Sequence, residues 1–143
     1  MQMQDRQPVV LGFAPMDDVH AEFDAIVGRA QACSDREFPA CLDEVVAHLR
    51  AHFAAEDAWM RETDFPPGDC HVDEHAAVLK SADEVQPLVA AGRIDIGRSF
   101  VAELARWFPG HADYLDSALA AWMCKRSFGG KPVVLQRRPR SAG

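Results

Sequence analysis

Histidine and carboxylate side chains recur along this chain at spacings typical of metal sites. Five of the six histidines form an ordered series with one glutamate and one aspartate: His20, His52-x-x-x-Glu56, His71-x-x-x-His75 and His111-x-x-x-x-Asp116. Imidazole nitrogens bind iron, zinc and copper, whereas carboxylates favour harder cations and can bridge two of them. These seven donors and one solvent bridge would fill two octahedral metals except for a single position. The series therefore predicts a dinuclear centre with room for a small ligand.

The spacing within each pair indicates how the donors converge. Residues four apart on an α-helix are separated by about 40° of rotation, so they lie on one face of the helix. His52 with Glu56, and His71 with His75, can therefore point to common sites between helices. The donors are too many for one zinc ion, which usually takes about four ligands.

The last pair does not fit a regular helix. His111 and Asp116 are five residues apart, which corresponds to about 140° of rotation. Pro109 and Gly110 stand immediately before His111. Proline removes a helical hydrogen bond and glycine weakens the helix, so this pair predicts a kink or a widened turn. We hypothesise that it alters access to the metal pocket or ligand affinity without abolishing metal binding.

Apolar residues recur at helical spacing in four segments, which must position these donors. The expected helices run from Asp17 or Asp18 to a break at residues 33–39, from near Pro39 to about Glu62, from near Asp69 through Leu88, and from about Asp95 to Lys125. Asp17 or Asp18 is expected to cap the first helix, and Ser34 or Asp35 the second. With almost no strand pattern, the chain is predicted to be all-α, an up-down-up-down four-helix bundle.

Charge is distributed unevenly along the 143 residues. The net charge is -7, yet residues 125–143 hold six of the 15 basic residues and none of the 22 acidic ones. We therefore divide the chain into an N-terminal arm (1–16), a helical bundle (17–125) and a basic C-terminal tail (126–143). The tail is interpreted as a solvated extension, with docking to a protein partner as the alternative; no nucleic-acid partner is expected.

Composition is ordinary for a single globular domain, with 48% hydrophobic and 26% charged residues. No apolar run reaches the ~20 residues of a membrane-spanning helix, and no secretory signal is evident, so a cytoplasmic location is expected. The four cysteines form no C-x-x-C pair and are expected to be free thiols. Cys70, next to His71, is expected to pack beside the site rather than to bind metal.

The ordered donors resemble the hemerythrin family, and bacterial single-domain hemerythrins in particular. Three local motifs strengthen the resemblance, which covers about residues 10 to 124: Asp17-x-x-His20, His52-Phe53-x-x-Glu56 followed by Met60, and Trp107-x-x-x-His111. The resemblance implies a hemerythrin-like bundle holding two iron ions (Fe2+/Fe3+) with an oxo or hydroxo bridge. It also implies a protein that is not an enzyme and that binds dioxygen reversibly for storage, delivery or sensing.

The resemblance further assigns a role to each donor. One iron would be saturated by His71, His75 and His111. The other, held by His20 and His52, would keep the open position, with Glu56 and Asp116 bridging the pair. An apolar pocket would exclude water from the bound dioxygen, and its walls are expected to include Phe23, Phe53, Trp59 and Trp107.

The same donors allow other interpretations. The principal alternative is a di-iron redox enzyme that reduces nitric oxide or peroxide at the same centre, although no dedicated acid, base or second-substrate pocket is evident. A ferritin-like oxidase is less consistent, because that class uses paired Glu-x-x-His motifs and more carboxylates. A haem site is disfavoured because no C-x-x-C-H occurs. The sixth histidine, His48, is interpreted as structural.

Overall fold

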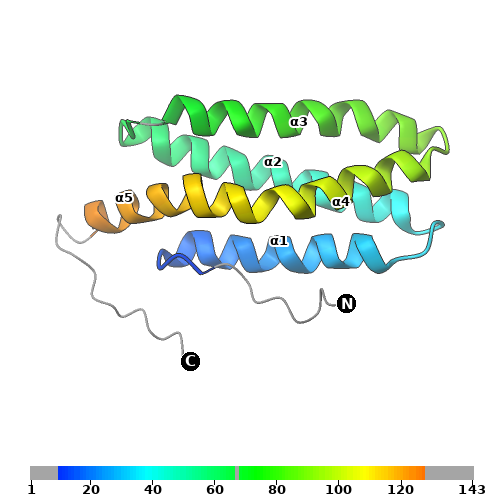
Figure 1. Ribbon diagram of the computed structural model, residues 1–143, viewed down its shortest axis with the longest axis horizontal. Coiled ribbons are helices and arrows are strands. Elements are labelled where there is room, and N and C mark those ends of the chain that lie inside the picture. The colour runs from blue at the N-terminus through cyan, green and yellow to red at the C-terminus, as the bar shows by residue number, and fades with distance from the viewer. Residues whose placement is uncertain (1–9, 67, 128–143) are drawn as a thin grey trace.

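The computed structural model describes residues 10–66 and 68–127. In this part the chain forms α1 (Ala14–Ala32), α2 (Phe38–Glu62), α3 (Gly68–Ala90), α4 (Ile94–His111), the π-helical turn η2 (Ala112–Asp116) and α5 (Ser117–Ser127). Successive long helices run in opposite directions, and α5 continues the rod that α4 begins (Figure 1). The predicted all-α, up-down-up-down four-helix bundle is confirmed.

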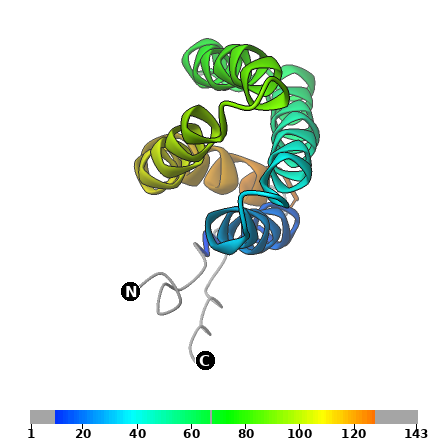
Figure 2. The same cartoon turned by 90° about the vertical axis from the view of Figure 1, so that its right-hand side faces the viewer.

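The four rods surround a common core. Viewed along the bundle, α1, α2, α3 and α4 follow one another around the core (Figure 2), and α1 contacts α4 to close the ring. Each helix therefore has one face turned inward. Short connections enforce this arrangement, since neighbours in the sequence become neighbours in the bundle.

A polar layer divides the apolar core into two clusters. The main cluster occupies the part of the bundle where α1 and α2 are joined, and it includes Phe23, Leu42, Leu49, Phe53, Val101 and Phe108. The end cluster, near α5, consists of Met16, Met60, Phe65, Leu119 and Ala120. Along α1, the buried His20 lies between Met16 and Phe23; along α2, the buried Glu56 lies between Phe53 and Met60.

The start of the first helix differs from the sequence-based expectation. Helix α1 begins at Ala14 rather than at Asp17 or Asp18. Pro15 accounts for the earlier start, because its fixed φ suits the first turn of a helix and its missing N–H is not needed there. The Asp17 carboxylate instead accepts hydrogen bonds from the backbone N–H groups of Leu11 and Gly12, at 2.7 and 3.0 Å. It thus ties the preceding segment to the helix.

The breaks between helices are held by local hydrogen bonds. The Ser34 hydroxyl accepts one from the Glu37 N–H at 3.2 Å, in the turn before α2. The expectation that Ser34 or Asp35 caps α2 itself is wrong, because its N-cap residue is Glu37 and no side chain caps it. Gly92, with φ of 105°, ends α3. The backbone N–H of Arg93 then donates to the Leu88 carbonyl at 2.9 Å, and that of Gly92 donates to the Val89 carbonyl. This Schellman motif requires a residue that tolerates positive φ, which explains the glycine.

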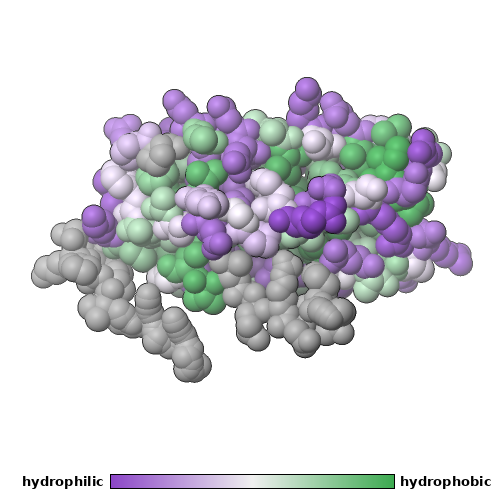
Figure 3. Space-filling model, in the orientation of Figure 1, coloured by the Kyte–Doolittle hydropathy of each residue, from purple (hydrophilic) through white to green (hydrophobic). Residues whose placement is uncertain are grey.

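Polar side chains are spread over the face shown in Figure 3, with smaller apolar areas between them. Among residues 10–66 and 68–127, no helix combines the length and hydrophobicity needed to cross a bilayer. None of Cys33, Cys41, Cys70 and Cys124 forms a disulfide, as expected. Cys70 is exposed, however, so the expectation that it packs beside the site is wrong. Apart from its first two residues, the predicted basic tail lies outside the described residues.

The core generates a matched test of packing at two helical glycines. A Cβ added at Gly97 would lie 2.5 Å from both the ring of the fully buried Phe38 and a methyl group of Val89, whereas a Cβ at Gly28 would meet nothing within 4 Å. We predict that Gly97→Ala lowers the free energy of unfolding by about 1–3 kcal/mol through overpacking. Gly28→Ala should raise it by about 0.5–1 kcal/mol. Urea denaturation would measure both, and equal effects of the two substitutions would contradict the packing argument.

Candidate metal centre

The seven donors predicted from the sequence converge inside the bundle. Every buried polar or charged residue of the described chain belongs to this set, and none of them is more than 4% exposed: His20, His52, Glu56, His71, His75, His111 and Asp116. A core that buries polar groups must supply partners for them, because an unpaired buried charge is very costly. The concentration of polar burial at this one level marks it as the candidate functional site.

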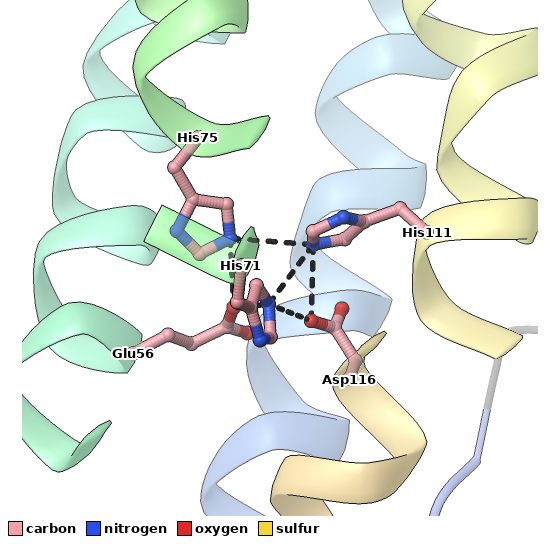
Figure 4. A group of neighbouring side chains, drawn as sticks. All are labelled: Glu56, His71, His75, His111 and Asp116. Carbon is pink, nitrogen blue, oxygen red and sulfur yellow. Dashed lines mark hydrogen bonds and ion pairs between the residues drawn. The ribbon is translucent and has the colours of Figure 1, made fainter. Parts of the chain in front are cut away.

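Each long helix contributes to the site. His20 comes from α1, His52 and Glu56 from α2, and His71 and His75 from α3. Figure 4 shows Glu56, His71, His75, His111 and Asp116 pointing toward one another from three sides. Because the i,i+4 pairs lie on single helix faces, regular α-helix geometry suffices to align them.

The last two donors need an irregular helix. The backbone N–H of Ser117 donates to the Ala112 carbonyl, an i→i+5 hydrogen bond that closes a π-helical turn. This wider turn brings the Asp116 Oδ1 atom to 3.0 Å from His111 Nε2, although the two residues are five apart. The widened turn predicted beside Pro109 and Gly110 is confirmed: it begins two residues after Gly110, at Ala112–Asp116.

The donor atoms form two groups that share both carboxylates. Within each group the ligand atoms lie within 4.8 Å of one another; the first group is Glu56, His71, His75, His111 and Asp116, and the second is His20, His52, Glu56 and Asp116. The histidines thus fall into the same two sets, of three and of two, that the resemblance implied. A metal ion at the first group would thus have one more protein donor than a metal ion at the second.

Each carboxylate directs one oxygen to each group. Asp116 places Oδ1 at 2.8 Å from His71 Nε2, and Oδ2 at 3.1 Å from His20 Nε2. Glu56 places Oε1 at 3.2 Å from His75 Nε2, and Oε2 at 2.9 Å from His52 Nε2. Two oxygens of one carboxylate that face different sets of nitrogens have the arrangement that bridges two cations.

Hydrogen bonds alone do not satisfy this set. The Nε2 atom of His111 lies 3.2 Å from the Nε2 atoms of both His71 and His75, and these three nitrogens converge on the oxygens of only two carboxylates, Glu56 and Asp116. His20 Nε2, Glu56 Oε1 and Asp116 Oδ2 are buried and, despite the short contacts given above, make no well-aligned hydrogen bond within the described residues. Metal cations would satisfy all these lone pairs together, so the chemistry of the donor set fits a metal site.

The electrostatics of the site also favour cations. Burial would raise the pKa of Glu56, but its contacts with four histidines reverse this and hold the pKa well below its ordinary value. The pKa of Asp116 is likewise lowered, against its burial, by His111, His20 and His71. Burial would lower the pKa values of His20 and His71, yet contacts with Asp116 and Glu56 raise both to about 9. The two carboxylates are thus ionised and require positive charge beside them.

Two further carboxylates, which the sequence reasoning missed, support the histidines from behind. The Nδ1 atom of His75 lies 2.8 Å from Asp57 Oδ1, and that of His111 lies 2.9 Å from Glu74 Oε1. A ring that donates its Nδ1–H to a carboxylate keeps Nε2 unprotonated and directed into the site. The available signal was adjacency, since Asp57 follows Glu56 and Glu74 precedes His75.

Aromatic rings surround the donors, and three of the four residues expected in the pocket wall contact donor histidines, although Trp107 contacts only the first group. The ring of Phe53 stacks on His75 with centroids 4.0 Å apart, and Trp107 stacks on His111 at 4.3 Å. Phe23 contacts His52 edge-on at 6.3 Å. Trp59 instead packs against the end cluster, with its ring 5.4 Å from that of Phe13.

Phe108, which sequence reasoning did not propose for the wall, lies beside the second group. Its ring packs edge-on against His20, with centroids 4.9 Å apart, and at a tilt against Phe23, with centroids 4.4 Å apart. Its position three residues before His111 was the available signal, because residues three apart share a helix face. Phe108 and Phe23 therefore form an apolar wall at the position with fewer donors.

His48 belongs to neither donor group. Its ring packs edge-on against His52 with centroids 5.4 Å apart, and its Nδ1 atom lies 3.5 Å from Glu22 Oε1. Burial and the neighbouring His52 lower the pKa of His48. This residue is thus partly buried packing next to a donor.

The fold and the donor set define a class: a helical bundle that binds metal ions within its core. The chain belongs to the hemerythrin family, because the family described as hemerythrin HHE cation binding domain matches residues 11–123. It is 40% identical to a bacteriohemerythrin of Ralstonia nicotianae (strain ATCC BAA-1114 / GMI1000) over 116 residues, 81% of this chain and 85% of that protein. No solved structure matches the chain. The resemblance noted from the sequence is confirmed.

The extra residue of the π-helical turn can be tested by deletion, because a deletion changes how later residues are rotated about the helix axis. A π-turn holds one residue more than an α-turn, so deletion of Tyr114, which is 81% exposed within η2, should restore a regular helix without rotating α5. His111 and Asp116 would then be separated by four positions and still share a face. We predict that this variant keeps its helix content and its metal, as measured by circular dichroism and elemental analysis.

The matched control is deletion of Arg106, an exposed residue of α4 whose ion pair with Glu103 lies on the surface. Inside a regular α-helix, this deletion rotates every later residue by about 100° and turns His111 away from the site. It should therefore lose metal. Retention of metal by both deletion variants would refute the phase argument.

Proposed function

We propose that this protein holds two iron ions at the site and binds dioxygen reversibly. The first iron would take His71, His75 and His111, and the second His20 and His52. Glu56 and Asp116 would bridge them, together with a solvent-derived oxo or hydroxo group. The observation that carries the proposal is the unequal division of donors: five in one group and four in the other. The smaller group leaves a coordination position for a small ligand.

The donor types favour iron over softer metal ions. Imidazole nitrogens and carboxylate oxygens both suit iron, whereas softer metals favour sulfur ligands, and neither donor group contains a cysteine. When bound, the iron pair supplies the electrons and the open position with which dioxygen combines. Membership of a family described as cation binding, and similarity to a protein named bacteriohemerythrin, support the same conclusion.

The chain's own residues favour holding a ligand over converting it. Phe23 and Phe108, 3% and 1% exposed, form an apolar wall beside His20 and so exclude water from the second position. Within residues 10–66 and 68–127, the buried polar side chains are the seven donors alone. A further ionisable group lies beside the second group of donors in this part of the chain: His48, whose ring packs on His52 and whose pKa is lowered by burial, so that it is a poor source of protons. A dry site with so little proton supply favours release of the ligand unchanged.

The proposal predicts a reversible optical change. The purified protein should contain about two iron ions per chain, and the reduced form should gain a visible absorption band in dioxygen that argon removes. The spectrum should survive several such cycles. Direct conversion to a ferric form that argon does not reverse would contradict reversible binding. Sustained turnover of nitric oxide or peroxide with a reductant would instead favour the redox-enzyme alternative.

The shared carboxylates provide a second prediction. Glu56 faces both donor groups, so Glu56→Ala removes an oxygen from each position at once. We predict that this variant binds at most one iron per chain and loses the response to dioxygen, as measured by elemental analysis and absorption. Glu62→Ala is the control, because Glu62 is an exposed residue of the same helix and should leave iron content unchanged. Full iron content in Glu56→Ala would exclude a bridging role.

A further inference from the structure

The five histidines of the site differ in what supports their outward nitrogens. His75 Nδ1 pairs with Asp57 and His111 Nδ1 pairs with Glu74, at 2.8 and 2.9 Å. Both carboxylates are only partly exposed, at 28% and 42% of their side-chain surface. The two supported histidines belong to the same donor group, the one with five members.

The other three histidines lack such support. The Nδ1 atoms of His20, His52 and His71 are buried and have no hydrogen-bond partner among the described residues. Both histidines of the four-member group are therefore unsupported. Their surroundings are aromatic instead, since Phe108 packs on His20 and Phe23 packs on His52.

Support of this kind acts directly on metal affinity. A carboxylate that accepts the Nδ1–H bond fixes the tautomer and the orientation of the ring, and it raises the basicity of Nε2. Loss of one such partner typically lowers metal affinity by about 10- to 100-fold. The five-member group has two such carboxylates and one more donor. It should therefore bind its metal ion much more tightly than the four-member group does.

We infer that the centre binds its two metals with unequal strength, and that Asp57 and Glu74 are the positioning residues that create the difference. The position of His71, His75 and His111 fills first and empties last. The position of His20 and His52, which carries the open coordination site, is the labile one. This inference rests on the proposed iron pair. It further predicts that the protein has a stable form with one metal ion bound.

The test is stepwise release of ferrous iron from the loaded, reduced, full-length protein. Under anaerobic conditions, increasing concentrations of an iron(II) chelator should remove iron in two separated steps, with a plateau at about one iron per chain. In the double variant Asp57→Ala with Glu74→Ala, the second step should move toward the first by about 10²- to 10⁴-fold in chelator concentration. The first step should stay in place.

Two further variants separate positioning from structural damage. Asp73→Ala removes an exposed carboxylate next to Glu74 on α3 and should leave both steps unchanged. Asp57→Asn keeps an oxygen that can accept the His75 Nδ1–H bond but loses the charge, so it should recover part of the affinity lost in Asp57→Ala. Circular dichroism would verify that each variant keeps its helices.

The outcomes discriminate this inference from the proposed function. Release of both irons in one step from the unaltered protein, or an unchanged second step in the double variant, would overturn the inference while leaving dioxygen binding intact. Two steps with the expected shift, in a protein that does not bind dioxygen reversibly, would support the inference and refute the proposed function. The inference needs only metal content as its readout.

Discussion

The whole structure depends on how a set of buried, partly charged donors is neutralised. Two ionised carboxylates in an apolar core would cost far more than the few kcal/mol that keep a domain folded, unless positive charge lies beside them. Glu56 and Asp116 obtain it either from protons, since the pKa values of His20 and His71 are raised to about 9, or from metal cations. Metal binding here is therefore an exchange of protons for cations, and loading is coupled to pH.

The bundle meets this constraint because the rotational position of the donors around each helix axis turns them inward. On α2 and α3 the i,i+4 spacing aligns two donors with no departure from regular geometry. The last rod must place His111 in the site and also seat Leu119 in the end cluster. The π-turn η2 reconciles these requirements, because one extra residue in one turn brings Asp116 beside His111 while α5 keeps its inward face. A local irregularity is thus the means by which a regular bundle completes its donor set.

Much of this arrangement was accessible from the sequence, for reasons that particular residues illustrate. The donors were predictable because helical spacing fixes which residues on one helix share a face, and the irregular turn was predictable because five-residue spacing violates that rule. Contacts between helices were not accessible in this way. Asp57 and Glu74 reach histidines on other helices, and Phe108 rather than Trp59 faces the second group, because helix rotation and crossing decide these contacts. The exposure of Cys70 likewise depends on how the helices pack. The start of α1 at Ala14 depends on Pro15, which suits the first turn of the helix.

The two sides of the centre differ in a way that relates affinity to function. Charged support lies behind His75 and His111, whereas aromatic rings lie beside His20 and His52. A carboxylate behind a ligand strengthens metal binding but also brings polar, partly exposed groups close to the site. Aromatic rings in the same place do not raise the metal affinity, but they exclude water. A position that must accept and release a small ligand benefits from the second arrangement, while its neighbour can anchor the pair through the first. Under the proposed function, weak metal retention at the position of His20 and His52 would follow from the same apolar surroundings that keep this position dry.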